Sequence, residues 1–150
     1  MNELKWEYKK FDELSPRELY GILKLRSEVF VVEQNCVYLD PDGKDQESFH
    51  LGGWIGNDLV AYARILPPGL AFDEASIGRV VTNPRFRKTG SGRILMEKAI
   101  EHTLSEFNVS EIMIGAQLYL LSFYTSLGFL QCGPEYIEDG IPHIEMKLSK

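Results

Sequence analysis

Apolar and polar residues alternate along several short segments of the chain. Alternation with a period of two is typical of a half-buried strand. Trp6 and Tyr8 alternate with Glu7 and Lys9 in the first such segment, and Gly56-Asn57-Asp58 predicts a hairpin turn between two later strand-like runs. With the short apolar run at 112–114 and the other strand-like runs, strands are expected at residues 6–11, 49–55, 59–66, 75–82, 112–114, 129–137 and 144–148.

Three longer segments have apolar residues at helical spacing. Ser15-Pro16-Arg17-Glu18 is a capping box with proline at the first helical position, so the first helix should begin at Pro16 and reach Glu28 or beyond. A second should follow Gly92 and end near Asn108, and a third should run from Leu118 to Leu127, with Gly128 as its cap.

The resulting order, β-α-β-β-β-α-β-α-β-β, predicts a mixed α/β sheet with helices on both sides. With 150 residues, 44% of them hydrophobic, the chain is the size of one domain with an ordinary core. We find no repeat, linker or low-complexity segment, so residues 1–150 are expected to form a single domain.

Charge is distributed unevenly along the chain. The whole sequence is acidic, with 16 basic and 22 acidic side chains and a net charge of -6, yet Ser76 to Met96 contains no Asp or Glu. One basic segment in an acidic chain suits a small polyanion better than a nucleic acid, which needs an extended basic face. The basic residues of this segment are Arg79, Arg85, Arg87, Lys88 and Arg93.

The basic segment also has the layout of an anion site. A strand should end at Thr82, and two glycines, Gly90 and Gly92, lead into the second helix. Backbone N–H groups at a helix N-terminus attract phosphate groups. The segment is neither a P-loop, because no lysine followed by serine or threonine comes after the glycines, nor a dinucleotide fingerprint, because Leu95 occupies the third glycine position.

Two segments of the sequence resemble motifs of a known superfamily. Val81 to Gly92 resembles the acyl-CoA binding motif of the GNAT N-acetyltransferases, and Phe123 to Phe129, downstream of Ala116-Gln117, resembles their F-Y-x-x-x-G-F segment. Glu28 to Gln34 and Asp139 to Ile144 look like the ElaA family within it. The resemblance implies a GNAT-like α/β (α+β) fold, with a mixed, mostly antiparallel sheet of about six to seven strands and helices on both faces. It also implies an acetyl-CoA-dependent N-acetyltransferase.

The resemblance assigns cofactor contacts to the basic segment. The main chain of Val80, Val81 and Thr82 should pair with the pantetheine arm as a neighbouring strand would. Arg85, Lys88 or Arg93 could meet the 3'-phosphate, and the spacing does not choose among them. The pyrophosphate should be held by the loop made of Arg87, Lys88, Thr89, Gly90, Ser91 and Gly92.

Two residues are expected to carry the chemistry. Tyr124 should face the cleft while Phe123 faces the core, and its phenol should contact the cofactor and protonate the departing thiolate. His143, in a P-H-I-x-M strand similar to one that carries a base histidine in some related enzymes, should accept the proton of the attacking amine. Glu33, acting through a water, is the alternative base.

The acceptor is expected to be a primary amine on a small molecule or peptide. Arg26 and Arg79 match positions that hold a substrate carboxylate or phosphate in such relatives, but a third arginine is replaced by Gln117, which argues against an acidic substrate. Asp40, Asp42, Asp45 and Glu47 are interpreted as a solvated turn, and His50 as a support for the hairpin.

The sequence also argues against a membrane location, a disulfide and a metal site. No apolar run could span a bilayer and the N-terminus lacks a signal-peptide core, so the protein is expected to be cytoplasmic, away from membranes and nucleic acids. Cys36 and Cys132 are expected to be reduced thiols, and the histidines show no metal-ligand spacing. A homodimer is compatible with the sequence. The alternative functions are a catalytically silent CoA-binding or regulatory module, and a nucleotide-binding regulator.

Overall fold

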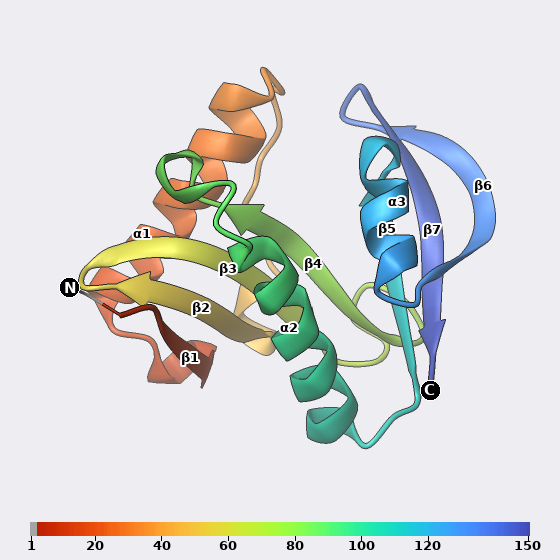
Figure 1. The fold of residues 1–150 in the computed structure, drawn as a ribbon, viewed down its shortest axis with the longest axis horizontal. Coiled ribbons are helices and arrows are strands. Elements are labelled where there is room, and N and C mark those ends of the chain that lie inside the picture. The colour runs from red at the N-terminus through yellow and green to blue at the C-terminus, as the bar shows by residue number, and fades with distance from the viewer. Residues whose placement is uncertain (1–2) are drawn as a thin grey trace.

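The computed structural model describes residues 3–150, which build a seven-stranded sheet with helices on both faces (Figure 1). The strands run in the order β1-β2-β3-β4-β5-β7-β6. They are β1 (Lys5–Lys10), β2 (Phe49–Ile55), β3 (Asp58–Leu66), β4 (Ala75–Thr82), β5 (Glu111–Gln117), β6 (Leu130–Glu138) and β7 (Ile141–Ser149). The helices are α1 (Pro16–Arg26), α2 (Ser91–Phe107) and α3 (Leu121–Ser126).

The sheet consists of two antiparallel halves joined by one short parallel contact. Strands β1 to β4 pair in sequence, and β7 pairs with both β5 and β6. Between β4 and β5 the register contains two pairs, Ala75 with Ile112 and Ser76 with Met113. Beyond these pairs the two strands diverge like the arms of a V (Figure 1). The parallel join therefore opens a gap in the middle of the sheet.

Helices α1 and α2 cover opposite faces of the first four strands (Figure 1). Ile22 and Leu25 of α1 pack with Tyr62 of β3, whereas Leu95 and Met96 of α2 belong to the larger core with the strand residues of the other face. Helix α3 covers β5 and β7 on the same face as α2 (Figure 1). Alternation along β3 thus supplies both cores from one strand.

The predicted capping box forms at the start of α1. The Glu18 N–H donates to Ser15 Oγ (3.1 Å), and the Ser15 N–H donates to Glu18 Oε1 (2.8 Å). After Arg26 the chain continues as a π-helical segment, η2 (Ser27–Glu33), so the helical path extends past Glu28 as predicted. This extension carries Glu33 to the gap between the two halves of the sheet.

Several predicted boundaries shift. Strand β5 is longer than residues 112–114, and α3 is shorter than predicted because Leu118–Leu120 forms a separate 3-10 turn. The last hairpin turns at Asp139 and Gly140, both with positive φ, so Ile141 and Pro142 already belong to β7 rather than to the turn. Gly128 follows α3 with φ 104°, as its predicted capping role requires.

Candidate active site

A cavity of about 1350 Å³ occupies the gap between β4 and β5. Its walls come from η2, β3, β4, β5, α3, β6 and β7, so both halves of the sheet contribute to it. Lys88 to Ser91 do not line it, although their neighbours on both sides do. The predicted site residues that line it are Arg79, Val80, Val81, Thr82, Arg87, Gly92, Gln117, Tyr124, His143 and Glu33.

The cofactor loop, residues 87–92, ends at the first turn of α2. Gly90 precedes the helix with φ 81°, a conformation that favours glycine. Ile94 N–H donates to Gly90 O (3.3 Å), so the amides before Ile94 precede the helical ladder and point toward the loop. A Cβ on Gly92 would meet only Thr82 Cγ2, at 3.5 Å, which leaves room beside the backbone. The loop is therefore an open cradle that fits a phosphate group.

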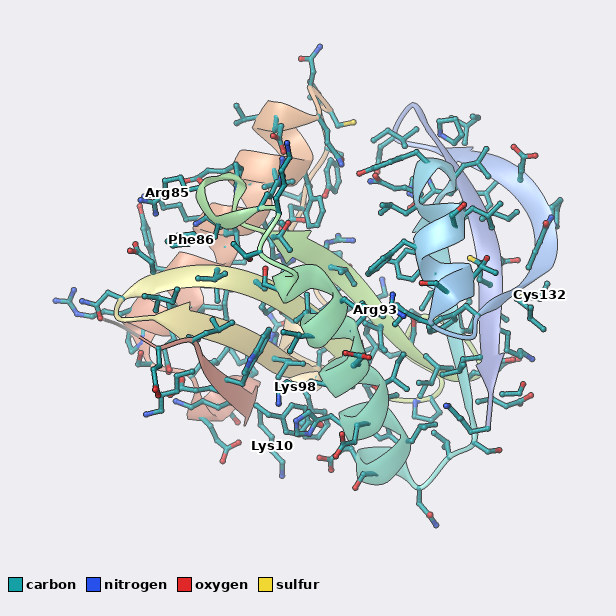
Figure 2. The ribbon with its side chains drawn as sticks, in the orientation of Figure 1. Lys10, Arg85, Phe86, Arg93, Lys98 and Cys132 are labelled. Carbon is teal, nitrogen blue, oxygen red and sulfur yellow. The ribbon has the colours of Figure 1, made fainter. Side chains whose placement is uncertain are left out.

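Basic side chains surround this loop but already have partners. Arg85 lies 3.3 Å from Asp58 Oδ1 on the exposed surface, and Arg93 donates to Ser126 Oγ (2.9 Å), which links α2 to α3. Figure 2 shows Arg85 and Phe86 on the loop before α2, and Arg93 on the side of α2 that faces α3. This exposed link joins α2 to the helix that carries Tyr124.

Arg87 forms a two-pronged ion pair with Glu33. Its Nη1 and Nη2 donate to Glu33 Oε2 (2.8 Å) and Oε1 (2.6 Å), and both side chains remain well exposed. The hydrogen bonds from Arg87 lower the pKa of Glu33, which makes this carboxylate a weaker base. The predicted phosphate ligand Arg87 and the alternative base Glu33 are thus paired with each other.

Tyr124 lines the cavity from α3 and is 5% exposed. Its ring packs edge-on against Phe123 and Phe129. Phe123 packs against the core as predicted, but it also lines the cavity and is less buried than Tyr124, which belongs to the same core. Burial, with a smaller contribution from Tyr119, raises the pKa of the Tyr124 hydroxyl, so the phenol keeps its proton at neutral pH.

His143 lines the opposite wall from β7 and is 7% exposed. Its Nδ1 lies 2.7 Å from the carbonyl oxygen of Ile141, which can only accept, so Nδ1 carries the hydrogen and Nε2 of the neutral ring has a free lone pair. The nearest carboxylate oxygen to Nε2 is Glu138 Oε2, at 3.8 Å. The ring therefore has the tautomer that a proton acceptor needs.

His143 stands in a row of side chains across three strands. It is the register partner of Gln117 on β5 and of Tyr136 on β6, so all three lie on one face. The Tyr136 ring stacks on His143 with centroids 5.5 Å apart. Gln117 exchanges two amide hydrogen bonds with Gln34 (3.3 Å each), which bridges the gap from β5 to the end of η2.

Gly115 explains how Tyr136 fits. A Cβ on Gly115 would lie 2.5 Å from the Tyr136 hydroxyl oxygen and 4.0 Å from Phe72. Tyr136 and Phe72 therefore converge over this glycine. Sequence reasoning missed Tyr136, although its place on the strand opposite His143 could have been found from the two-residue turn between β6 and β7.

The comparisons with known proteins agree with this geometry. The acetyltransferase (GNAT) domain family matches residues 25–150. A protein of Schizosaccharomyces pombe is 45% identical over 150 residues, which cover 99% of each chain, and ElaA of Escherichia coli is 42% identical over 145 residues, which cover 95% of each. The chain belongs to the ElaA family of GNAT acetyltransferases.

Two crystal structures of the GNAT fold superpose closely on the chain. That of E. coli ElaA has a TM-score of 0.91 and covers 98% of this chain and 100% of its own. That of an acyl-CoA N-acyltransferase from Pseudomonas aeruginosa is 38% identical, with a TM-score of 0.93 and the same coverage. The predicted GNAT fold and the resemblance to the ElaA family are both confirmed.

In this GNAT domain Arg26 does not reach the cavity, which corrects the expectation that it binds substrate. Arg26 is fully buried; its Nε donates to Asp40 Oδ2 (2.7 Å) and its Nη1 to Asp45 Oδ1 (2.8 Å). A guanidinium enclosed in this way leaves no face for a substrate carboxylate. Its role is to tie α1 to the loop before β2.

The interpretation of the aspartates as a solvated turn was also wrong. Asp40 and Asp45 are 2% and 6% exposed and belong to a buried ionic network with Arg26, Arg64 and Arg79. Asp42 completes the network through a bidentate pair with Arg64 (2.7 and 2.8 Å). Burial alone would raise the pKa of Asp42, but the hydrogen bonds from Arg64 outweigh it and hold that pKa well below its usual range. Sequence reasoning gave Arg64 no role, because nothing in a strand pattern reveals a buried ion pair.

Arg79 connects the network to the cavity. It has φ 50° and sits with Val80 opposite Ala63 alone, so β4 has a bulge there. Its Nη2 donates to the carbonyl oxygen of Asp40 (2.8 Å), and its Nε lies 2.9 Å from Asp40 Oδ1 without pointing its hydrogen at that oxygen. Arg79 thus reaches the cavity wall with its charge already balanced.

Residues 3–150 include no helix long and apolar enough to cross a membrane. Among them no three His, Cys, Asp or Glu side chains are grouped as a metal ion would need.

Proposed function

We propose that this protein transfers an acetyl group from acetyl-CoA to a primary amine by direct attack in a ternary complex. The observation that carries the proposal is the single cavity that connects the cofactor loop, the unpaired edge of β4, Tyr124 and His143. The similarity to an acyl-CoA N-acyltransferase of P. aeruginosa supports the acyl-CoA part.

The residues fit the parts of the cofactor separately. The cradle before α2 suits the pyrophosphate, with Arg87 within reach if it exchanges Glu33 for a phosphate oxygen. From Ile77 onward the described part of β4 has no strand partner on the β5 side, so Val80, Val81 and Thr82 can offer backbone groups to the amides of pantetheine. In this arrangement the thioester would lie near the centre of the gap.

The transfer then needs one proton acceptor and one proton donor. The amine nitrogen attacks the thioester carbonyl carbon and passes its proton to Nε2 of His143, whose free lone pair faces the cavity. The tetrahedral intermediate collapses, the C–S bond breaks, and the CoA thiolate takes the proton of the Tyr124 hydroxyl. The products are an amide and free CoA.

The test follows free thiol release from acetyl-CoA with a panel of amines. Tyr124→Phe should lower kcat by about 10²-fold or more, the usual contribution of a positioned acid, while the Kd for CoA changes less than about twofold. Tyr20→Phe, on the exposed face of α1, is the matched control and should leave both unchanged. Tight CoA binding without turnover for any amine would instead favour a silent CoA-binding module.

A further inference from the structure

The acceptor end of the cavity has a charge pattern that distinguishes between classes of amine. If the proposed function holds, the attacking nitrogen must lie near His143 Nε2, on the face formed by β5, β7 and β6. The charges around that point therefore decide what else the acceptor carries. The arginines of the buried ionic network, of which Arg64 and Arg79 line the same cavity, provide the first contrast.

The arginines of the buried network offer nothing to an acidic acceptor. Arg26, Arg64 and Arg79 face three aspartates, Asp40, Asp42 and Asp45, so the network is neutral as a whole. The Nε atoms of Arg64 and Arg79 lack hydrogen-bond partners among residues 3–150, but both are inaccessible to solvent and cannot meet a ligand in the cavity. A substrate carboxylate would have to compete with the aspartates.

The carboxylates around His143 have no such partners. Glu145 follows His143 by two residues on the same face of β7, about 7 Å along the strand, and lines the cavity. It forms no ion pair or hydrogen bond within the described chain, and its Oε1 lies over Gly133. Glu138 lies on the other side of His143. Both lie near the Tyr136 ring, because Glu138 is two residues from Tyr136 on the same face of β6 and Glu145 is two residues from His143, which stacks on that ring.

The side chain of His143 also indicates that a ligand binds at this place. It is buried to more than nine-tenths, yet its Nε2 has no hydrogen-bond partner among residues 3–150 and faces the cavity. The rings of Phe72 and Tyr136 provide an apolar surface beside it. Lys44 also lines the cavity, on the loop that carries the ionic network rather than on the β5-β7-β6 face.

We propose that the acceptor is an aliphatic diamine or polyamine. One nitrogen loses its proton to His143 and attacks the thioester, while a second nitrogen stays protonated and is held by Glu145 or Glu138. The hydrocarbon between the nitrogens lies against Tyr136 and Phe72. Transfer forms one amide, releases CoA and leaves the second ammonium unchanged. This inference rests on the proposed function, and deepens it by naming the acceptor class.

The test compares three amines that share a four-carbon chain and differ at the far end. Putrescine carries a second ammonium, n-butylamine a methyl group and γ-aminobutyrate a carboxylate. We expect kcat/KM for putrescine to exceed that for n-butylamine about tenfold, with γ-aminobutyrate lowest. Equal or higher turnover with n-butylamine or γ-aminobutyrate would overturn the inference.

Variants locate the second ammonium. Glu145→Gln should lower kcat/KM for putrescine about tenfold, and the more exposed Glu138→Gln about threefold, with little effect of Glu145→Gln on n-butylamine. Glu135→Gln, on β6 but outside the cavity lining, is the matched control. If Glu145→Gln and Glu138→Gln slow all three amines equally, the carboxylates do not recognise a second ammonium and the inference fails.

A binding measurement separates this inference from the proposed reaction. Calorimetry on the protein–CoA complex should show that putrescine binds about tenfold more tightly than n-butylamine, and that Glu145→Gln removes the difference. This preference without thiol release would retain the acceptor class and overturn the transfer reaction. Its absence would overturn the acceptor class, whether or not thiol release occurs.

Discussion

Arginine meets carboxylate in two places that differ in burial and in position. Arg26, Arg64 and the aspartates of the loop before β2 form a network beneath α1, where Arg26 is fully buried. Arg87 and Glu33 pair at the mouth of the cavity with both side chains well exposed. The two sets use the same chemistry, yet only the second can exchange a protein partner for a ligand.

The difference shows why residue type alone misleads in this chain. A buried guanidinium has already lost its hydration and depends on its carboxylates, so the cost of removing either partner is large. An exposed pair loses little when a phosphate replaces the carboxylate. The buried arginines therefore hold the walls of the site in place, and the exposed one is free to act at it.

Breaking the buried network should have the largest effect. Arg26→Gln removes the buried cation that Asp40 and Asp45 share, so each keeps one arginine, Arg79 and Arg64 respectively. We expect this loss to lower the free energy of unfolding by about 3–5 kcal/mol. Arg85→Gln, which removes an exposed pair with Asp58, is the control and should cost less than about 1 kcal/mol. Chemical denaturation measures both. Similar values for the two variants would contradict the comparison.

Low pH should have the next largest effect, on the stability that the buried network contributes. Burial alone would raise the pKa of Asp42 and Asp45, but hydrogen bonds from Arg64 and Arg26 outweigh it and lower both pKa values. Such carboxylates stabilise the fold above their unfolded pKa, near 3.9, and this stabilisation is lost as the pH falls through the folded pKa. We expect the free energy of unfolding to decrease below about pH 4. For each carboxylate, the total decrease is about 1.4 kcal/mol for every unit by which folding lowers its pKa. Denaturation at a series of pH values measures this, and Arg64→Gln should flatten the fall, whereas an unchanged slope would contradict it.

The exposed arginine should matter for binding rather than for folding. Arg87→Ala removes a charged donor from the cofactor loop, and we expect the Kd for CoA to rise about tenfold while the unfolding free energy changes by less than about 1 kcal/mol. Calorimetry and denaturation measure the two effects. Loss of stability without loss of affinity would assign Arg87 to the fold.

The smallest effect concerns the partner of Arg87. Glu33→Gln frees Arg87 from its ion pair, so we expect the Kd for CoA to stay level or fall by at most about fivefold. Because the pair is exposed, added salt should reduce the difference between wild type and variant. Affinity that drops instead, in the same titration, would show that Glu33 contributes to binding directly.

The fold was predictable because each element carries a local signal. The capping box at Ser15 and the strand-like runs on either side of Gly56-Asn57-Asp58 set their elements without help from distant residues. The π-helical continuation after Arg26 and the division of 118–127 into a 3-10 turn and α3 were not visible, since the spacing of apolar residues does not distinguish these forms from an α-helix.

The site was predictable where it follows a motif and unpredictable where it follows the tertiary structure. The positions of Tyr124 and His143 at the cavity, and of Gly90 before α2, come from matched segments, and the roles of these residues stay predictions. The partners of Arg26 are 14 and 19 residues away in a loop without periodic pattern, so the sequence could not show that its charge is balanced. Tyr136 over Gly115 depends in the same way on the register between strands.

The two residue pairs that join β4 to β5 also bear on how the molecule moves. Seven strands share one sheet, yet the strand pairing between its halves is a single short parallel contact, beside the common core under α2 and side-chain links such as Arg93 to Ser126. Local opening favours regions with few shared hydrogen bonds. Amides of β4 beyond Ser76 should therefore exchange with solvent faster than those of β3, and a bound molecule that spans the gap would slow them. The short parallel join between β4 and β5 is therefore the part of the sheet that a ligand can stiffen most.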